Sequence, residues 1–253
     1  MSPQQIINLA ATLGWQDLKD SYRRSKLGTF WVTLGMTLQI ATIGFVFAMI
    51  FSSNLDDYLP YLAIGIIFWT YMTATLTEGS SAFIAASAII KQLPIPPMVF
   101  LLRNTWKNTI VLGHNILIIP VVLILFSVHL GMGILVSVAG FVLLTANLFW
   151  MTTLLAIAAT RFRDIPPMVN SVLHIAFYVT PIMWSPMLIP SGLAHNLLGL
   201  NPFYHFIQLV RLPLMGGSPT FENWFISLTF LFVGSIITYF ILLKFKSRLA
   251  YWV

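Results

Sequence analysis

Long apolar segments separated by short polar connections run along almost the whole chain. Six of these segments are about as long as the roughly 20 mostly apolar residues that a transmembrane helix needs. Prolines, glycines and charged residues stand between them, as expected where helices end. The pattern therefore predicts an all-α membrane protein with six transmembrane helices, over residues 29–51, 59–80, 100–127, 133–158, 166–188 and 221–243.

The N-terminal segment 3–26 is predicted to be an amphipathic helix that lies in the lipid headgroup layer. Basic residues flank its apolar face, which is typical of a helix on anionic lipid. Ile6, Leu9 and Leu13 lie off that face, and a partner protein is the alternative surface for them. The apolar face itself has residues at spacings of three and four: Ile7, Ala11, Trp15, Leu18 and Tyr22.

The segment 189–220 is too interrupted by proline and glycine to be one span, and too apolar to be a free loop. It is predicted to form a re-entrant hairpin of two short helices that enters from the outer side. Irregular backbone at membrane depth is tolerated where protein buries it or where it lines a watery cavity. A helix lying on the outer membrane surface is the alternative interpretation.

Composition agrees with a membrane protein. Of the 253 residues 58% are hydrophobic and 8% are charged, whereas soluble domains have about 45–50% and about 25%. The apolar segments cover most of the chain, so residues 1–253 are predicted to form a single membrane domain. The chain contains no cysteine, which excludes disulfides and thiolate metal sites.

The charged residues predict the orientation of the chain. If six spans alternate, twelve of the thirteen basic residues fall on one side. Arg211 falls on the other side, together with Asp56, Asp57 and Glu222. Because cytoplasmic loops carry the excess of Lys and Arg, both termini are predicted to be cytoplasmic. Topology thus accounts for the net charge of +6, and no nucleic-acid partner is expected.

Residues suited to catalysis are sparse. The sequence has no G-x-x-x-x-G-K-[ST] phosphate loop, no H-E-x-x-H motif and no pair of carboxylates spaced for acid–base work. Besides Arg103, Lys107 and Glu222 at span ends, the ionisable candidates within the spans are Glu78, His114 and His174. The two histidines are expected to hydrogen-bond across helices. We therefore expect no enzyme activity, metal or cofactor on this chain. A membrane-embedded transferase of glycan assembly is the alternative.

Four stretches, taken in order, resemble one family of proteins. They are YRRSKLGTFW (22–31), IIKQLPIPPMVFLLRN (89–104), RFRDIPPMVNSVLHIAFYVTPIMWSPMLIP (161–190) and NPFYHFIQLVRLPL (201–214). Together they resemble type-2 ABC exporter permeases, in particular the polysaccharide-export branch of Wzm-type O-antigen permeases and their capsule and teichoic-acid relatives. In that branch an Arg-Asp turn precedes the fifth span and a Thr-Pro-Ile step breaks it. Here these are Arg163-Asp164 and Thr180-Pro181-Ile182.

The resemblance implies a half-transporter in the lipid of the bacterial inner membrane. A second copy of the chain would complete the pore, and two separate ATPase subunits would bind ATP and Mg. The implied cargo is a polysaccharide linked to undecaprenyl diphosphate, with the O-antigen of lipopolysaccharide preferred over capsule or teichoic acid. A drug or small-lipid exporter of the same superfamily is the alternative within transport.

Two groups of site residues are expected at the cytoplasmic side. One is a basic cluster where the lipid diphosphate would enter, because Arg grips phosphate bidentately; general attraction to anionic lipid is the alternative. The other would contact the ATPases through the connection 85–98 and the turn before the fifth span, with Asp164 paired to Arg103 or Arg24. The first group is Arg23, Arg24, Lys26, Arg103 and Lys107, and the second is Lys91, Pro94, Pro96, Arg161, Arg163 and Asp164.

A third group consists of aromatic residues that would line a glycan channel. Aromatic faces present a large apolar area, which suits the C–H groups of sugar rings. An aromatic belt at the membrane interfaces is the alternative explanation. The residues are Trp31, Trp69, Phe177, Tyr178 and Trp184.

Overall fold

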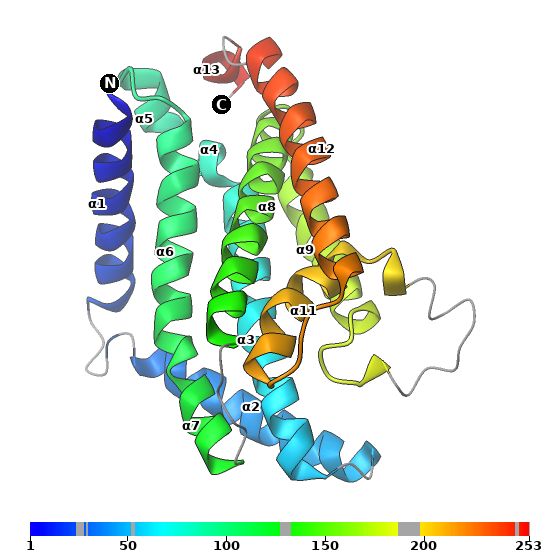
Figure 1. The fold of residues 1–253 in the computed structure, drawn as a ribbon. Coiled ribbons are helices and arrows are strands. Elements are labelled where there is room, and N and C mark those ends of the chain that lie inside the picture. The colour runs from blue at the N-terminus through cyan, green and yellow to red at the C-terminus, as the bar shows by residue number, and fades with distance from the viewer. Residues whose placement is uncertain are drawn as a thin grey trace.

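The protein is an antiparallel arrangement of helices, and both chain termini lie at the same end of it (Figure 1). The computed structural model describes residues 1–23, 28, 30–51, 54–126, 133–186, 198–245 and 248–252. All regular secondary structure in these residues is helical, without a strand. The predicted all-α class is therefore confirmed.

Five helices are long and apolar enough to cross a membrane. They match five of the predicted spans to within four residues at either end. The remaining prediction, 166–188, corresponds to a shorter apolar helix, α9 (Ile165–Val179), so a count of six spans is not confirmed. The five are α2 (Phe30–Phe51), α3 (Leu55–Ser80), α6 continued by α7 (Met98–Ile116 and Ile118–Leu125), α8 (Gly133–Arg161) and α12 (Phe221–Phe245).

Prolines explain where several helices end. Helix α9 stops at Val179 because Thr180 precedes a proline, which disfavours the α conformation, and its ψ is 132°. Pro120 lacks the N–H that would bond the carbonyl of Ile116, and the chain is divided there into α6 and α7. The proline-rich stretch 94–97 separates α5 (Ser87–Gln92) from α6, as predicted.

Helix α1 (Pro3–Tyr22) lies lengthwise beside α6 (Figure 1). It begins with a capping box, in which the side chains of Ser2 and Gln5 each accept a backbone N–H of the other residue. Gly14 permits a close approach, since a methyl group there would lie 2.9 Å from the carbonyl oxygen of Arg103. Ile7 and Trp15, on the predicted apolar face, remain exposed. The predicted position in the headgroup layer is not confirmed.

Helix α3 is the central element, and α2 and α9 pack on one side of it. Most of α3 is buried, with Leu62, Ile67 and Met72 fully so. Helix α2 runs obliquely to α3 (Figure 1) and is exposed over most of its apolar surface. Its buried residues recur at every fourth position, which is the spacing of one helix face: Met36, Ile40, Gly44 and Ala48.

Helix α11 (Pro202–Leu214) is buried among α3, α8 and α12. It begins at Asn201, whose side chain accepts the backbone N–H of Phe203. Eight of its thirteen residues are buried, which does not fit a helix lying on the membrane surface. Residues 189–197 of the predicted re-entrant hairpin lie outside the described residues, so a second helix of that hairpin is not confirmed.

Small residues on α8 allow α11 to pack closely against it. Ser137 donates a hydrogen bond to the carbonyl oxygen of Val210 at 2.7 Å. A methyl group at Gly140 would lie 2.5 Å from the carbonyl oxygen of Leu209. Small residues that bring helix backbones together are typical of membrane proteins.

We expect Gly140→Leu to destabilise the protein by about 1–3 kcal/mol, because the added side chain must push α8 and α11 apart. Thermal unfolding of the detergent-purified protein, followed by size-exclusion chromatography, measures the change. Gly113→Leu is the matched control, since Gly113 is exposed and has open space around it. Equal melting temperatures for the two variants would contradict the close packing.

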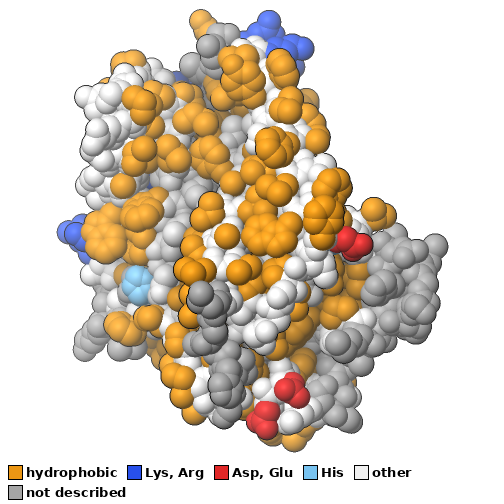
Figure 2. Space-filling model, in the orientation of Figure 1, with side chains coloured by type: hydrophobic (Ala, Val, Ile, Leu, Met, Phe, Trp, Pro, Cys, Tyr) orange, Lys and Arg blue, Asp and Glu red, His pale blue; other side chains and the backbone are white. Residues whose placement is uncertain are grey.

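The surface is largely apolar along the bundle. In the view of Figure 2 hydrophobic side chains are spread over the face, with basic groups at the top and at the left edge and acidic groups at mid-height on the right and at the bottom. The end that carries the termini also carries α4 (Ala82–Ala85), α5 and α13 (Leu249–Trp252). A second buried cluster, which includes Phe83, Leu101 and Leu249, holds these short helices to the bundle.

Candidate functional site

A groove of about 530 Å³ lies between α3 and α9, and we call it the α3–α9 groove. Its volume lies within the range of about 300–1,000 Å³ typical of ligand sites. One side chain, Gln39, comes from α2. The other lining residues come from α3 (Trp69, Thr70, Thr73, Ala74, Thr77 and Glu78) and from α9 (Asn170, Leu173, His174, Phe177 and Tyr178).

Both walls of the groove follow helical periodicity. On α3 the spacing from Thr70 through Thr73 and Ala74 to Thr77 and Glu78 is that of a single helix face. Residues on α9 show the same spacing. Polar residues repeated along one face of an apolar segment are the sequence signal of this groove, and they were not among the predicted site residues. The threonines of α3, together with Gln39 and Asn170, were not predicted as functional groups.

One end of the groove, which we call its distal end, is aromatic. The ring of Trp69 lies 5.8 Å from that of Phe177 and 5.6 Å from that of Phe203, centroid to centroid. Tyr178 is 72% exposed, and its ring centroid lies 5.5 Å from that of Phe177. The opposite, proximal end is polar and contains Glu78. The groove thus offers ring faces at one end and hydrogen-bonding groups at the other.

Three of the five residues predicted to line a glycan channel meet in the groove: Trp69, Phe177 and Tyr178. Trp184 lies next to the distal end, where its indole N–H donates to the carbonyl oxygen of Tyr178 at 3.1 Å. Trp31 does not line the groove; it is 61% exposed near the start of α2.

The histidines differ from expectation. His174 is exposed in the groove, and His114 bonds a carbonyl of its own helix, that of Ile110. Among the described histidines, His205 is the one that links α11 to α12. Its Nδ1 lies 2.8 Å from Asn223 Oδ1 on α12, and its Nε2 lies 2.8 Å from the carbonyl oxygen of Gly199. Among the described residues neither His114 nor His174 has a hydrogen bond to another helix, so that expectation is not confirmed.

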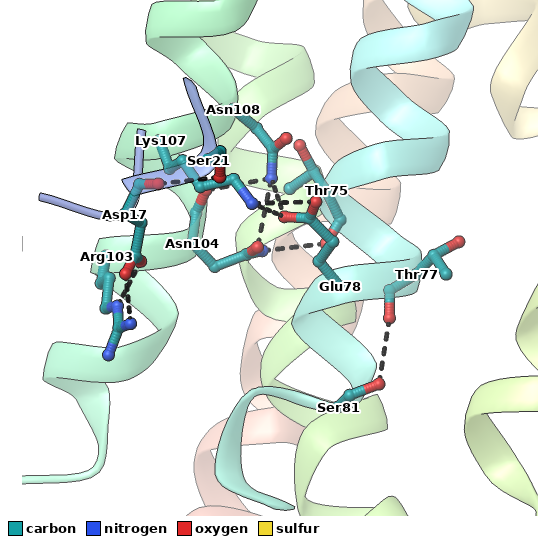
Figure 3. A network of polar contacts seen from close by, with 10 residues as sticks. All are labelled: Asp17, Ser21, Thr75, Thr77, Glu78, Ser81, Arg103, Asn104, Lys107 and Asn108. Carbon is teal, nitrogen blue, oxygen red and sulfur yellow. Dashed lines mark hydrogen bonds and ion pairs between the residues drawn. The ribbon is translucent and has the colours of Figure 1, made fainter. Parts of the chain in front are cut away.

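A charged network lies beside the proximal end, where α1, α3 and α6 meet (Figure 3). The guanidinium of Arg103 donates two hydrogen bonds to the carboxylate of Asp17. Glu78 accepts from Lys107 at 3.0 Å and from Asn108 at 2.9 Å. Each cation thus has a carboxylate partner, and the two ion pairs carry no net charge.

Of the predicted basic cluster, the structure brings together Arg103 and Lys107, which line a small pocket of about 140 Å³. Arg23 is exposed at the end of α1. Arg24 and Lys26 lie outside the described residues. Because carboxylates already occupy Arg103 and Lys107, a diphosphate would have to compete with Asp17 and Glu78 for them.

We expect Asp17→Ala and Arg103→Ala to loosen α1 to similar extents, with a coupling energy of about 1 kcal/mol, as measured for bidentate, partly exposed pairs. A double-mutant cycle on thermal stability measures it. The same variants test diphosphate binding. If Arg103 binds phosphate, Arg103→Ala lowers transport while Asp17→Ala does not; if the pair only holds α1, both lower it equally.

The residues predicted to contact an ATPase are collected at the end that carries the termini. Lys91, Pro94, Arg161, Arg163 and Asp164 are exposed there, and Pro96 is half-buried. Helix α13, which no sequence pattern had linked to this group, contributes to it as well. The Arg161 guanidinium lies 5.9 Å from the ring centre of Trp252, and Arg163 donates to the Trp252 carbonyl oxygen at 3.5 Å.

The expected pair of Asp164 with Arg103 is wrong. Arg103 bonds Asp17, a residue 86 positions away in the sequence. Arg24, the other candidate, lies outside the described residues. In the part of the chain that the structure describes, the ion pairs are Arg103–Asp17 and Lys107–Glu78, so Asp164 has none there.

Comparison with known proteins gives end-to-end relatives. Two of them are proteins of Klebsiella pneumoniae named O-antigen export system permease protein RfbA. One is 27% identical over 241 residues, which is 92% of this chain and 89% of the relative. The other is 26% identical over 255 residues, which is 97% of this chain and 95% of the relative. The chain is similar to O-antigen export permeases. A Myxococcus xanthus protein of the same name is 26% identical over 204 residues, 78% of this chain and 76% of the relative. No protein-family model matches the chain.

The predicted resemblance to polysaccharide-export permeases is thereby confirmed. Because one permease match extends over 97% of the chain, it includes both α3 and α9, the helices that form the groove. The groove itself contains one carboxylate, Glu78, among its lining residues. Its ring faces and amide, hydroxyl and imidazole groups suit binding of a neutral polar ligand better than acid–base catalysis.

Proposed function

We propose that this chain is the membrane permease subunit of an ATP-driven exporter of O-antigen polysaccharide. The observation that carries the proposal is the similarity, over 78–97% of the chain, to three O-antigen export permeases. Five apolar helices of spanning length support a multi-pass protein of the inner membrane. On this view the chain is a transport subunit and not an enzyme.

The α3–α9 groove would carry the glycan. A polysaccharide presents C–H faces and hydroxyl groups along its length. Trp69, Phe177 and Tyr178 offer aromatic faces for the C–H groups. Polar groups for the sugar hydroxyls come from Gln39, Thr70, Thr77 and Asn170. A ligand that slides needs contacts that are numerous, weak and similar along the path, and rings and hydroxyls meet that need.

The chain would work with other molecules. A second copy would complete the pore, and two separate ATPase subunits, which bind ATP and Mg, would contact α5 and the turn 161–164. The glycan would be linked to undecaprenyl diphosphate. Both termini, which lie at one end of the bundle beside these elements (Figure 1), would be cytoplasmic, in agreement with the distribution of Lys and Arg.

Depletion of the chain from cells that make the polymer tests this function. A membrane-impermeant glycan label, applied to intact cells and to inverted vesicles, reports lipid-linked glycan in the two leaflets. Accumulation on the cytoplasmic side with loss from the surface is expected. Loss of polymer from both sides would instead indicate a role in synthesis, and unchanged polymer would indicate a drug or small-lipid exporter.

A further inference from the structure

The chain between α9 and α11 leaves the helical conformation while it is still buried. Thr180 is 1% exposed and Ile182 is not exposed at all, although residues 180–185 form no helix. Backbone carbonyls released from a helix inside a membrane protein must find other donors. We call residues 180–184 the unwound segment. It follows directly after Phe177 and Tyr178, at the distal end of the groove.

Two tyrosines of α3 donate to carbonyl oxygens of the unwound segment. The Tyr58 hydroxyl bonds Met183 at 2.6 Å. The Tyr61 hydroxyl bonds Pro181 at 2.8 Å and Trp184 at 3.2 Å. These donors lie one helical turn apart, so the segment runs along α3 with the carbonyls of Pro181, Met183 and Trp184 directed at that helix.

Two side chains of the α11 region bond the same segment from another direction. Arg211 Nη1 donates to the Pro181 carbonyl oxygen at 2.9 Å. Asn201, the residue that caps α11, donates from Nδ2 to the Thr180 hydroxyl at 2.9 Å. The carbonyl of Pro181 therefore receives donors from both α3 and α11, and it joins the two helices at this point.

Arg211 places a charged guanidinium in a buried position, which is energetically unfavourable. It is 1% exposed, and its guanidinium lies 3.9 Å from the centre of the Tyr61 ring. Its Nε and Nη2 have no hydrogen-bond acceptor among the described residues. No carboxylate pairs with it there. Gly65 makes room for it, since a methyl group at that glycine would lie 2.6 Å from Nη2.

A buried, incompletely satisfied charge is destabilising. Its presence therefore suggests a role that an apolar residue could not perform. An apolar side chain such as Met or Leu would be enough to fill the space between α3 and α11. What Arg211 adds is a donor, directed at the carbonyl where α9 has been broken by proline. Its contact with the Tyr61 ring keeps that donor in place, because cation–π attraction is strongest where water is excluded.

We propose that Arg211 is a positioning residue for the distal end of the α3–α9 groove. By holding the Pro181 carbonyl, with Tyr61, it fixes the unwound segment and hence the place where α9 ends. The position of Tyr178 depends on that ending, and Trp184 is bonded to the Tyr178 carbonyl. The proposal rests on the proposed function in one respect, namely that the groove is the path of the glycan.

The chain lacks cysteine, so a single introduced thiol reports local accessibility without background. Ile182→Cys places a thiol in the buried unwound segment, and Ala156→Cys places one in the separate cluster around Phe83. Maleimide labelling of the purified protein in nanodiscs is measured for each. Arg211→Met is expected to raise the labelling rate at position 182 about tenfold, as loss of a hydrogen bond from a charged donor predicts, and to leave position 156 unchanged.

Three further variants separate positioning from general destabilisation. Tyr61→Phe, which keeps the ring and removes the hydroxyl, is expected to raise labelling at 182 as well. Arg211→Lys retains a donor and should restore slow labelling in part. Gln208→Met is the matched control, since Gln208 is also buried on α11 and its Oε1 also has no hydrogen-bond partner in the described part of the chain. It should change neither rate.

The proposal is overturned if Arg211→Met and Tyr61→Phe both leave labelling at 182 within twofold of the parent protein. It is also overturned if positions 156 and 182 become accessible together, because Arg211 would then support the whole fold. Export assays on the same variants address the groove. Faster labelling at 182 with unchanged export would support the positioning role of Arg211 while contradicting the groove as the path of the glycan.

Discussion

Thr73→Trp is expected to reduce surface polysaccharide roughly tenfold or more, because the indole would project into the middle of the α3–α9 groove and obstruct the path of a sugar chain. Thr73 is partly exposed and lines that groove from α3. The groove has about 530 Å³ of free volume, so the larger side chain can enter it without displacing the packed core. Surface labelling of cells at matched protein levels measures the effect.

Two controls make the result specific to volume. Thr229→Trp adds the same side chain at an exposed position on α12, and export should be unchanged. Thr73→Val keeps the shape and removes the hydroxyl. That hydroxyl already bonds the carbonyls of Trp69 and Thr70 in its own helix, so Val should also export normally. Surface polysaccharide within twofold of wild type in Thr73→Trp would show that the glycan does not pass here.

Phe83→Ala is expected to destabilise the end of the bundle that carries α4 and α5 by about 3–5 kcal/mol, the usual loss for truncating a buried Phe. Phe83 is 1% exposed, and its cluster includes Phe100, Leu101 and Leu249. If α5 contacts an ATPase, this cluster transmits its movement to the spans. Export per ATP hydrolysed should then fall sharply while the longer helices remain folded.

Phe240→Ala is the matched control for this prediction. Phe240 is 64% exposed on α12, and its removal should change stability by about 0.5 kcal/mol or less. Thermal unfolding, ATP hydrolysis and export are measured on the same preparations. A destabilised Phe83→Ala protein that exports normally per ATP would contradict the role of the cluster in transmission, although the packing prediction would stand.

The periodicity of polar residues in the sequence indicates both walls of the α3–α9 groove. Thr70, Thr73 and Thr77 recur along one face of an apolar segment, and Glu78 extends that face. The same regularity appears in α9, from Asn170 to His174 and on to Phe177. Periodicity of polar residues within a span indicates a face that avoids lipid. It does not show that the two faces lie opposite one another.

The network at the proximal end shows the opposite case. Arg103 and Lys107 share one face of a helix, and together they resemble a phosphate-binding cluster in the sequence. In the structure Asp17 and Glu78 neutralise them. Asp17 reaches Arg103 because Gly14 lets α1 approach α6 closely. No local pattern predicts a contact between residues so far apart in the chain.

The sequence by itself determined the helical class, the positions of five long helices and most of their ends. These depend on local properties, namely runs of apolar residues and prolines that remove a donor or disfavour the α conformation of the preceding residue. Only the tertiary structure decided which charges are paired, which of the aromatic residues share a groove, and that Arg211 is buried against Tyr61. Those outcomes depend on which helix faces pack together and in what register, and packing joins residues that the sequence separates.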